Sequence, residues 1–148
     1  MPEAPVVLQK ECADCCVAIT KAIFKAYKSD KAYAHFGEVL GTNGYNGSDP
    51  RTLESFLWKS GFKCQSGSMS IADLKSHSSQ GRLIACVVTL HGSGHYVLVD
   101  QVRFGKVRFL DPNVGIVRLG QKKFAEIWVD FDRFGLSYLS FGIATWKE

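Results

Sequence analysis

Three of the chain's five cysteines lie within residues 12–16, in the stretch LQKECADCCVAI. Cysteines this close together can be metal ligands, a redox pair, a reactive nucleophile or small core residues. Cys12 and Cys15 form a C-x-x-C pair, but no strand precedes them and no βαβ pattern follows, which disfavours thioredoxin-type redox chemistry. His91 and His95 are four residues apart in a glycine-rich turn rather than a helix, which disfavours a structural zinc site.

Cys15 is the cysteine best placed to act as a nucleophile. Apolar residues recur at spacings of three and four after it, which predicts a helix from Asp14 to Lys28 or Ser29. Asp14 is a favourable N-cap residue, so Cys15 and Cys16 are expected in the first helical turn. The positive end of the helix dipole favours the thiolate there, and the thiolate is the reactive form of cysteine.

A histidine and an aspartate are predicted to meet at one edge of a β-sheet. His95 begins the strand HYVLV, and Asp111 ends the strand KVRFLD. Two antiparallel strands joined by a turn at Gly105 lie side by side, so both residues fall at the same sheet edge. Asp111 can orient the His95 imidazole there, as the third member of a catalytic triad does. A lone histidine and an Asp-Pro turn are each common in other roles, and their combination with Cys15 is what points to catalysis.

Gln9 completes a possible catalytic set. It lies six residues before Cys15, in the segment that leads into the helix. Its amide can donate to an oxyanion formed beside the thiolate, together with backbone N–H groups of the helix start. An isolated glutamine is ordinarily exposed to solvent, so this role depends on the other three residues. The set predicts covalent attack on a carbonyl carbon, which needs no metal or organic cofactor.

The elements that position these residues change character along the chain. The first half reads as helices with a glycine-rich loop at residues 41–49, and the second half reads as short strands rich in β-branched and aromatic residues. After the first helix, helices are predicted at residues 50–61, with Ser48 or Asp49 as N-cap, at residues 70–78 and at residues 122–128. Strands are predicted at residues 82–90, 95–102, 106–111, 115–119 and 136–146. Helices followed by strands predict an α+β fold, an antiparallel sheet with helices packed on it.

Length and composition exclude several classes of protein. A chain of 148 residues, 46% hydrophobic and 22% charged, is typical of one globular domain, predicted here to span residues 1–148. No apolar run is long enough to insert in a membrane and no secretory signal is visible, which predicts a cytoplasmic protein. The net charge of +4 is mild and the basic residues are scattered, so nucleic-acid binding is not predicted. The odd number of cysteines favours free thiols.

These residues, in this order, resemble the C39 peptidases. The resemblance rests on Gln9-x5-Cys15, the apolar helix that follows, and the segment HYVLV with Asp-Pro sixteen residues beyond its histidine. The segments GSDPRTLESFLWKSGFKC and FAEIW are also similar to parts of the family. C39 peptidases are papain-like cysteine peptidases that remove leader peptides after a Gly-Gly motif, usually as the N-terminal domain of an ABC exporter. The resemblance implies a papain-like α+β fold, with Cys15 as nucleophile, His95 as general base and acid, Asp111 as its orienting partner and Gln9 as oxyanion donor.

Two departures from the family pattern affect what the resemblance implies. Cys16 stands where the family typically has glycine, which is expected to crowd the first helical turn. No exporter segments follow, and we expect a standalone protein, which leaves the exporter as a partner and the Gly-Gly preference open. A non-catalytic C39-like domain that binds a peptide or protein is the main alternative. The residues also leave an amidase, a transpeptidase and an isopeptidase as alternatives with the same acyl-enzyme chemistry.

Overall fold

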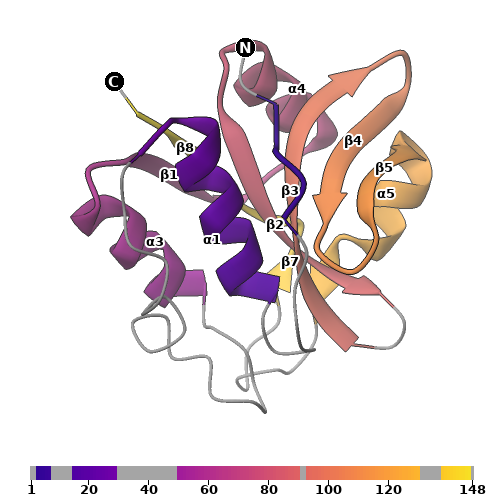
Figure 1. Cartoon of the computed structure of the whole chain (residues 1–148). Helices are drawn as coiled ribbons and strands as arrows, with labels where there is room; N and C mark the ends of the chain where they lie inside the picture. Colours follow the sequence, from indigo (N-terminus) through magenta and orange to yellow (C-terminus); the bar gives the residue numbers. More distant parts are fainter. Residues whose placement is uncertain (1–2, 8–14, 30–49, 91–92, 131–137, 148) are drawn as a thin grey trace.

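A six-stranded antiparallel sheet forms the centre of the molecule (Figure 1). The computed structural model describes residues 3–7, 15–29, 50–90, 93–130 and 138–147. The strand order is β1-β8-β2-β3-β4-β5, and β6 pairs with β7 in a separate two-stranded sheet. The strands are β1 (Lys63–Ser68), β2 (Leu83–Leu90), β3 (Ser93–Arg103), β4 (Lys106–Asp111), β5 (Gly115–Gly120), β6 (Val129–Asp130), β7 (Tyr138–Leu139) and β8 (Phe141–Trp146).

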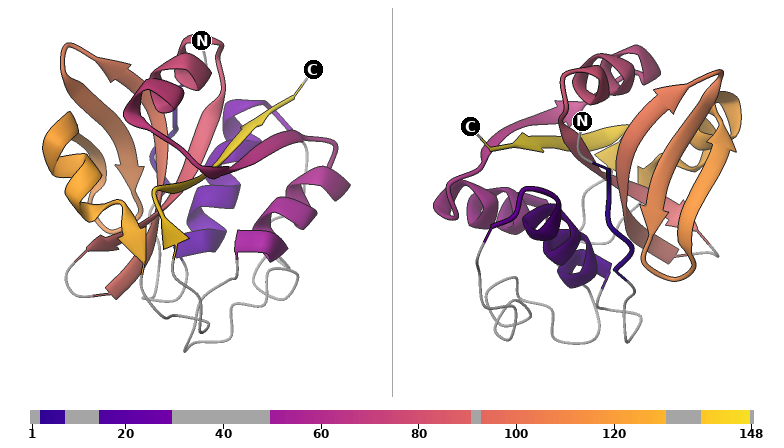
Figure 2. Two further views of the ribbon diagram at one scale, coloured as in Figure 1. Left: turned by 180° about the vertical axis from the view of Figure 1, so that it is seen from behind. Right: turned by 45° about the horizontal axis from the view of Figure 1, so that its top comes forward.

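Helices cover both faces of the central sheet (Figure 2). Helices α1 (Cys15–Ala26) and α3 (Pro50–Lys59) share one buried cluster with one face of the sheet. Helices α4 (Ile71–Ser79) and α5 (Gln121–Ile127) share a second cluster with the other face. The α+β fold predicted from the order of the elements is confirmed, with the helix that bears Cys15 packed on the antiparallel sheet.

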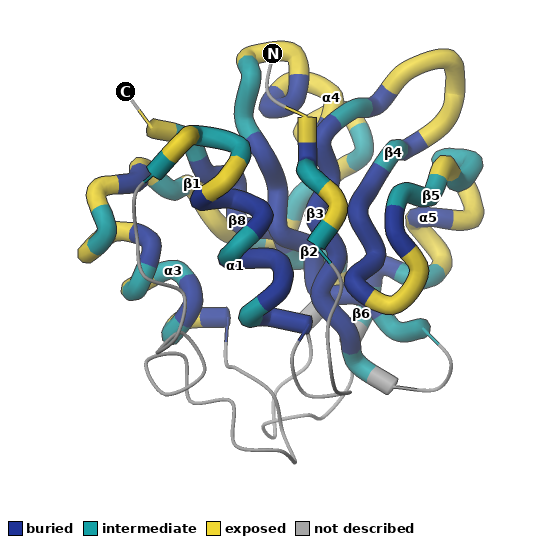
Figure 3. Tube along the Cα trace, viewed as in Figure 1, coloured by how far each residue is buried: buried dark blue, intermediate teal, exposed yellow. Residues whose placement is uncertain are grey.

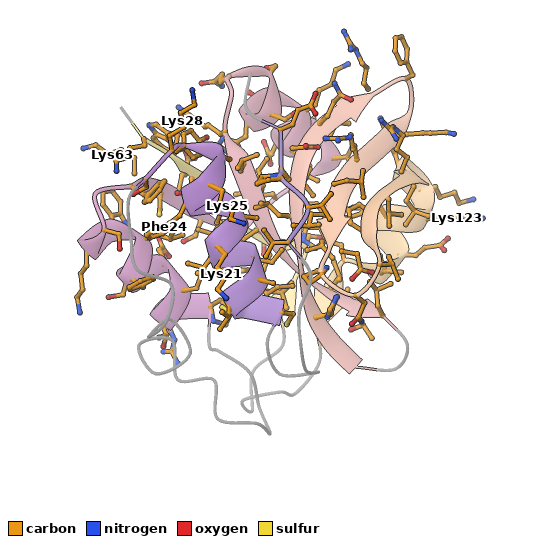
Figure 4. The ribbon with its side chains drawn as sticks, viewed as in Figure 1. Lys21, Phe24, Lys25, Lys28, Lys63 and Lys123 are labelled. Atoms are coloured by element: carbon orange, nitrogen blue, oxygen red, sulfur yellow. The ribbon has the colours of Figure 1, made fainter. Side chains whose placement is uncertain are left out.

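Helix α1 is held in place by burial, because eight of its 12 residues are buried (Figure 3). Phe24 is fully buried, and its ring centroid lies 5.9 Å from that of Phe56 and 5.1 Å from that of Phe62. Figure 4 shows Phe24 on the side of α1 that faces α3, while Lys21 and Lys25 lie on the outer side. Burying one such side chain contributes about 1.5–3 kcal/mol, so the first turn of α1 is fixed by the packing of the turns that follow it.

The predicted helices and strands agree with the structure to within a few residues, apart from the unpredicted two-residue strand β6 and two further exceptions described below. The helix predicted to run to Lys28 or Ser29 ends at Ala26. The predicted turn at Gly105 joins β3 to β4, and Ser70 caps α4 by accepting from the Asp73 N–H. The predicted caps at residues 14, 48 and 49 and the loop at residues 41–49 lie outside the described residues.

Strand β1 was not predicted from the sequence, which is the first exception. Its residues KCQSGS are polar or small and are mostly exposed, so they carry no apolar alternation. The strand exists because its backbone pairs with β8, from Lys63 opposite Trp146 to Ser68 opposite Phe141. Backbone pairing at the edge of a sheet leaves no pattern in the side chains when neither face is fully covered.

The second exception is a break in the strand predicted at residues 136–146. Ser140 has a left-handed backbone, with φ of 52°, and separates β7 from β8. Its N–H donates to the Trp128 carbonyl at 2.8 Å, and the Trp128 indole donates to the Phe141 carbonyl at 2.8 Å. These two hydrogen bonds hold the bend. Trp128 lies twelve residues before Ser140, too far away for a local sequence pattern to reveal the contact.

Candidate active site

Cys15 is the first residue of α1, at the end of the helix where the backbone N–H groups have no partner within the helix. Only 1% of its surface is exposed. Ile19 and Ile23, one and two turns further along α1, are fully buried and hold the helix against the sheet. The thiol therefore lies at the positive end of a rigid helix dipole, where negative charge is stabilised.

His95 and Asp111 lie in contact at the end of the sheet where β3 begins and β4 ends. The Nε2 atom of His95 is 2.8 Å from Oδ1 of Asp111, and the two residues are only 5% and 4% exposed. His95 is near the start of β3 and Asp111 is the last residue of β4. The antiparallel register, with Leu98 opposite Leu110, aligns these two strand ends as the sequence predicted.

The Asp111 carboxylate is held from a second side by the turn that follows it. Its Oδ1 atom also accepts from the Asn113 backbone N–H at 2.9 Å, and its carbonyl accepts from the Val114 N–H at 3.1 Å. From the sequence, Asp111 could either begin a turn or orient His95. Its contacts with Asn113 and with His95 are compatible with both roles. The Asn113 contact was missed, although Asp-Pro-Asn is a recognisable signal for an Asx turn.

The imidazole of His95 has Cys15 as its second partner. Burial lowers the pKa of His95, but the hydrogen bond with Asp111, the hydrogen bond with Cys15 and the negative charges of both raise it, to about 9. Because Nε2 faces Asp111, Nδ1 is the ring nitrogen left for the thiol. His95 is thus protonated at neutral pH, and its imidazolium faces the thiol at the start of α1.

The model of the Peptidase C39 family matches residues 3–131 of the chain. The chain belongs to the peptidase C39 family. A search of the curated proteins finds no match.

Solved structures of C39 peptidase domains are similar to the chain over nearly its whole length. The peptidase domain of Streptococcus ComA, a bi-functional ABC transporter involved in quorum sensing, has a TM-score of 0.79 at 20% identity and covers 99% of this chain and 100% of that one. A double glycine motif protease from an AMS/PCAT transporter, solved with its leader peptide, has a TM-score of 0.76 at 16% identity, with 97% and 91% covered. The peptidase domain of Streptococcus mutans ComA has a TM-score of 0.63 at 15% identity, with 95% and 98% covered. At these identities the likeness shows the shared fold.

The fourth residue of the predicted C39 set, Gln9, lies outside the described residues, as does Cys12. The segment before Gln9 is described, and it runs along β3 (Figure 1). The Ala4 N–H donates to Oδ2 of Asp100 at 2.8 Å. Ala4 is 4% exposed, so the chain that leads towards Gln9 is fixed on the sheet five residues upstream.

An ion pair strengthens this attachment of the N-terminal segment. The Asp100 side chain is 1% exposed and also accepts from the Arg108 guanidinium. A second nitrogen of Arg108 lies 3.6 Å from the Glu3 carboxylate. Asp100 was not predicted from the sequence, although a charged residue at the end of the buried run YVLV is unusual unless it has a partner.

Cys16, which stands where C39 peptidases typically have glycine, is fully buried in the cluster between α1 and the sheet. Its carbonyl accepts from the Thr20 hydroxyl at 2.7 Å, one turn further along the helix. Because its side chain points into the core, any effect of Cys16 on Cys15 is transmitted through the packing of the first helical turn.

In the described ranges, no three side chains of His, Cys, Asp or Glu gather closely enough to hold a metal ion, and His91 lies outside those ranges. Each helix that the structure describes is too short or too polar to cross a lipid bilayer.

Iodoacetamide at neutral pH is expected to alkylate Cys15 before Cys64 and Cys86. Burial, partly offset by a hydrogen bond with Thr145, raises the pKa of Cys64 to about 11, and burial raises the pKa of Cys86 well above its ordinary value. Cys15 instead lies beside the protonated His95. Quenched time points and peptide mapping by mass spectrometry give the three rates.

The same labelling experiment has an internal control. His95→Gln should slow the alkylation of Cys15 about tenfold or more and leave the rate at Cys64 unchanged. Equal, slow labelling of all three cysteines in the unmodified protein would contradict a thiolate at Cys15.

Proposed function

We propose that the chain is a cysteine peptidase in which Cys15 is the nucleophile, His95 the general acid and base, Asp111 the orienting residue and Gln9 an oxyanion donor. The observation on which this proposal rests is that the imidazole of His95 has two hydrogen-bonding partners. His95 bonds to Asp111 at 2.8 Å on one side and to the thiol at the start of α1 on the other. Membership of the C39 family supports the same chemistry.

The first half of the proposed reaction forms an acyl-enzyme. The Cys15 thiolate adds to the carbonyl carbon of the scissile peptide bond, and the carbonyl electron pair moves to oxygen. The backbone N–H groups at the start of α1 and the Gln9 amide donate to this oxyanion. As the tetrahedral intermediate collapses, the C–N bond breaks and Nδ1 of His95 gives its proton to the leaving amine. A thioester and a neutral imidazole remain.

The second half returns the enzyme to its starting state. Neutral His95 takes a proton from a water molecule as the water oxygen adds to the thioester carbonyl. The second tetrahedral intermediate collapses by breaking the C–S bond, which releases the carboxylic acid and the Cys15 thiolate. The imidazolium then faces a thiolate again. Asp111 keeps its hydrogen bond to Nε2 throughout, which keeps Nδ1 directed at the reacting atoms.

The proposed substrate is a precursor peptide that is cut after a Gly-Gly or other small-residue site to release its leader. One of the similar structures is the peptidase domain of a bi-functional ABC transporter, and another is a double glycine motif protease from an AMS/PCAT transporter in complex with the leader peptide. We accordingly propose an ABC exporter of peptides as the partner with which this peptidase works.

Mass spectrometry of the protein incubated with precursor peptides tests the proposal. A peptide with a Gly-Gly site is expected to be cut after the second glycine, and the matched peptide with Val-Val at that site is expected to remain intact. Binding of the Gly-Gly peptide without any cleavage would instead identify a non-catalytic C39-like binding domain. A product joined to an added amine would identify a transpeptidase.

A further inference from the structure

A groove lined by cations lies at the end of the β3–β4 hairpin that is remote from His95 and Asp111. Figure 3 shows the residues at this end of the hairpin as exposed. The groove has a volume of about 400 Å³ and is lined by Gln101, Arg103, Phe104, Lys106, Arg108 and Arg118. Four of these six side chains are cations and none is acidic.

The strand register places these cations opposite one another. Arg108 on β4 pairs with Arg118 on β5, and Arg103 on β3 pairs with Lys106 on β4. Like charges that face each other across neighbouring strands destabilise a sheet. Arg108 is neutralised by its ion pairs, but the other three cations form no ion pair with a described residue. This concentration of positive charge is therefore not explained by the stability of the fold.

Phe104, at the tip of the hairpin, is also unfavourable for folding. Its φ is 55° and that of Gly105 is 74°, so both central residues of the turn are left-handed. Asparagine or glycine is the residue usually found in the place of Phe104. The Phe104 side chain is 91% exposed, and the Arg103 guanidinium lies 5.4 Å from its ring centroid. A strained, exposed aromatic residue beside an arginine is typical of a binding surface.

From these features we propose that the groove binds an acidic segment of a partner protein. The guanidinium groups of Arg103 and Arg118 match carboxylates in bidentate geometry, and Phe104 offers an apolar contact to a side chain between them. Gln101 and Arg108, which also line the groove, are half-buried, so a narrow peptide fits this lining better than a flat lipid surface does. Because this surface does not use Cys15, the interaction is separate from the proposed peptidase activity.

Fluorescence anisotropy with a labelled peptide of repeating Glu-Ser-Glu-Phe tests this proposal on the full chain. We expect saturable binding that weakens as salt is raised, and binding at least about tenfold weaker when every Glu is replaced by Gln. The double variant Arg103→Glu/Arg118→Glu is expected to reduce affinity about tenfold or more. The milder Arg103→Gln/Arg118→Gln should reduce it by less, and thermal unfolding of each variant shows whether it remains folded.

A matched double variant controls for net charge. Lys59→Glu/Lys63→Glu changes the total charge equally, with Lys59 on α3 and Lys63 on β1. Figure 4 shows Lys63 on the opposite side of the molecule from the hairpin. It is expected to alter peptide affinity by less than about twofold. Equal losses in the two charge-reversal variants would overturn the proposal, as would no binding of the Glu peptide. Binding to phosphatidylglycerol vesicles but not to the Glu peptide would overturn it in favour of a membrane surface.

Discussion

Replacing Cys15 with alanine is expected to lower the rate of peptide cleavage about 10⁴-fold or more, to the background rate. The Cys15 sulfur is the only atom of the proposed set that forms a covalent bond to the substrate, so no other residue can replace it in the formation of the acyl-enzyme. Cys15→Ser should be almost as inactive, because a hydroxyl beside an imidazolium has no tendency to ionise. The measurement is kcat for a Gly-Gly precursor peptide, followed by mass spectrometry.

The matched control for this experiment is Cys64→Ala, which removes a thiol from the edge strand β1. Cys64 lies in a different part of the sheet and its sulfur bonds to Thr145, so kcat should stay within about twofold. Thermal unfolding should show Cys15→Ala to be folded, since a single small side chain is lost from the start of a helix. Cleavage by Cys15→Ala at the rate of the unmodified protein would exclude Cys15 as the nucleophile.

The contact between His95 and Asp111 could be predicted because it is local to one hairpin. Two strand segments and a turn at Gly105 determine which residues meet at the open end, and the hydrogen bond is found there. The approach of Cys15 to His95 is different, because eighty residues separate them. Helix periodicity placed Cys15 at the start of α1, but only the resemblance to the C39 peptidases placed that helix beside the sheet edge.

Apart from the local contact of Asn113 with Asp111, the features that the sequence did not reveal depend on a distant partner. Strand β1 is formed by pairing with β8, and the bend at Ser140 by bonds with Trp128. Asp100 appears in the sequence as one polar residue in an apolar strand, but it is buried because Ala4 and Arg108 both donate to it. In each case the stabilising group lies outside the window in which hydrophobic spacing or turn residues carry information.

Asp111→Asn is expected to move the alkaline limit of peptide cleavage to lower pH. In the unmodified protein His95 has a pKa of about 9, so activity should fall as pH rises through about 9 and the imidazolium is lost. Asparagine can still bond to the ring, but it carries no charge. Burial would then dominate and bring the pKa of His95 back towards its ordinary value of 6.5.

The size of this effect depends on pH. Each unit by which the His95 pKa falls reduces the protonated fraction about tenfold above the new pKa, so a loss of about tenfold or more is expected at pH 8.5. At pH 6 the loss should be much smaller. The pH profile of kcat/KM and the titration of the His95 ring followed by NMR measure the shift independently. Asp73→Asn, a matched change at the exposed cap of α4, should leave both profiles unchanged.

The same variant separates an orienting role for Asp111 from a purely structural one. A histidine whose pKa is raised in the folded state contributes stability that is complete below its unfolded pKa of about 6.5 and disappears as pH rises through about 9. The melting temperature of the unmodified protein should therefore fall as pH rises from about 6.5 to about 9, and that of Asp111→Asn should fall less. If Asp111 served only the turn at Asn113, the variant would lower the melting temperature equally at every pH and leave the activity profile in place.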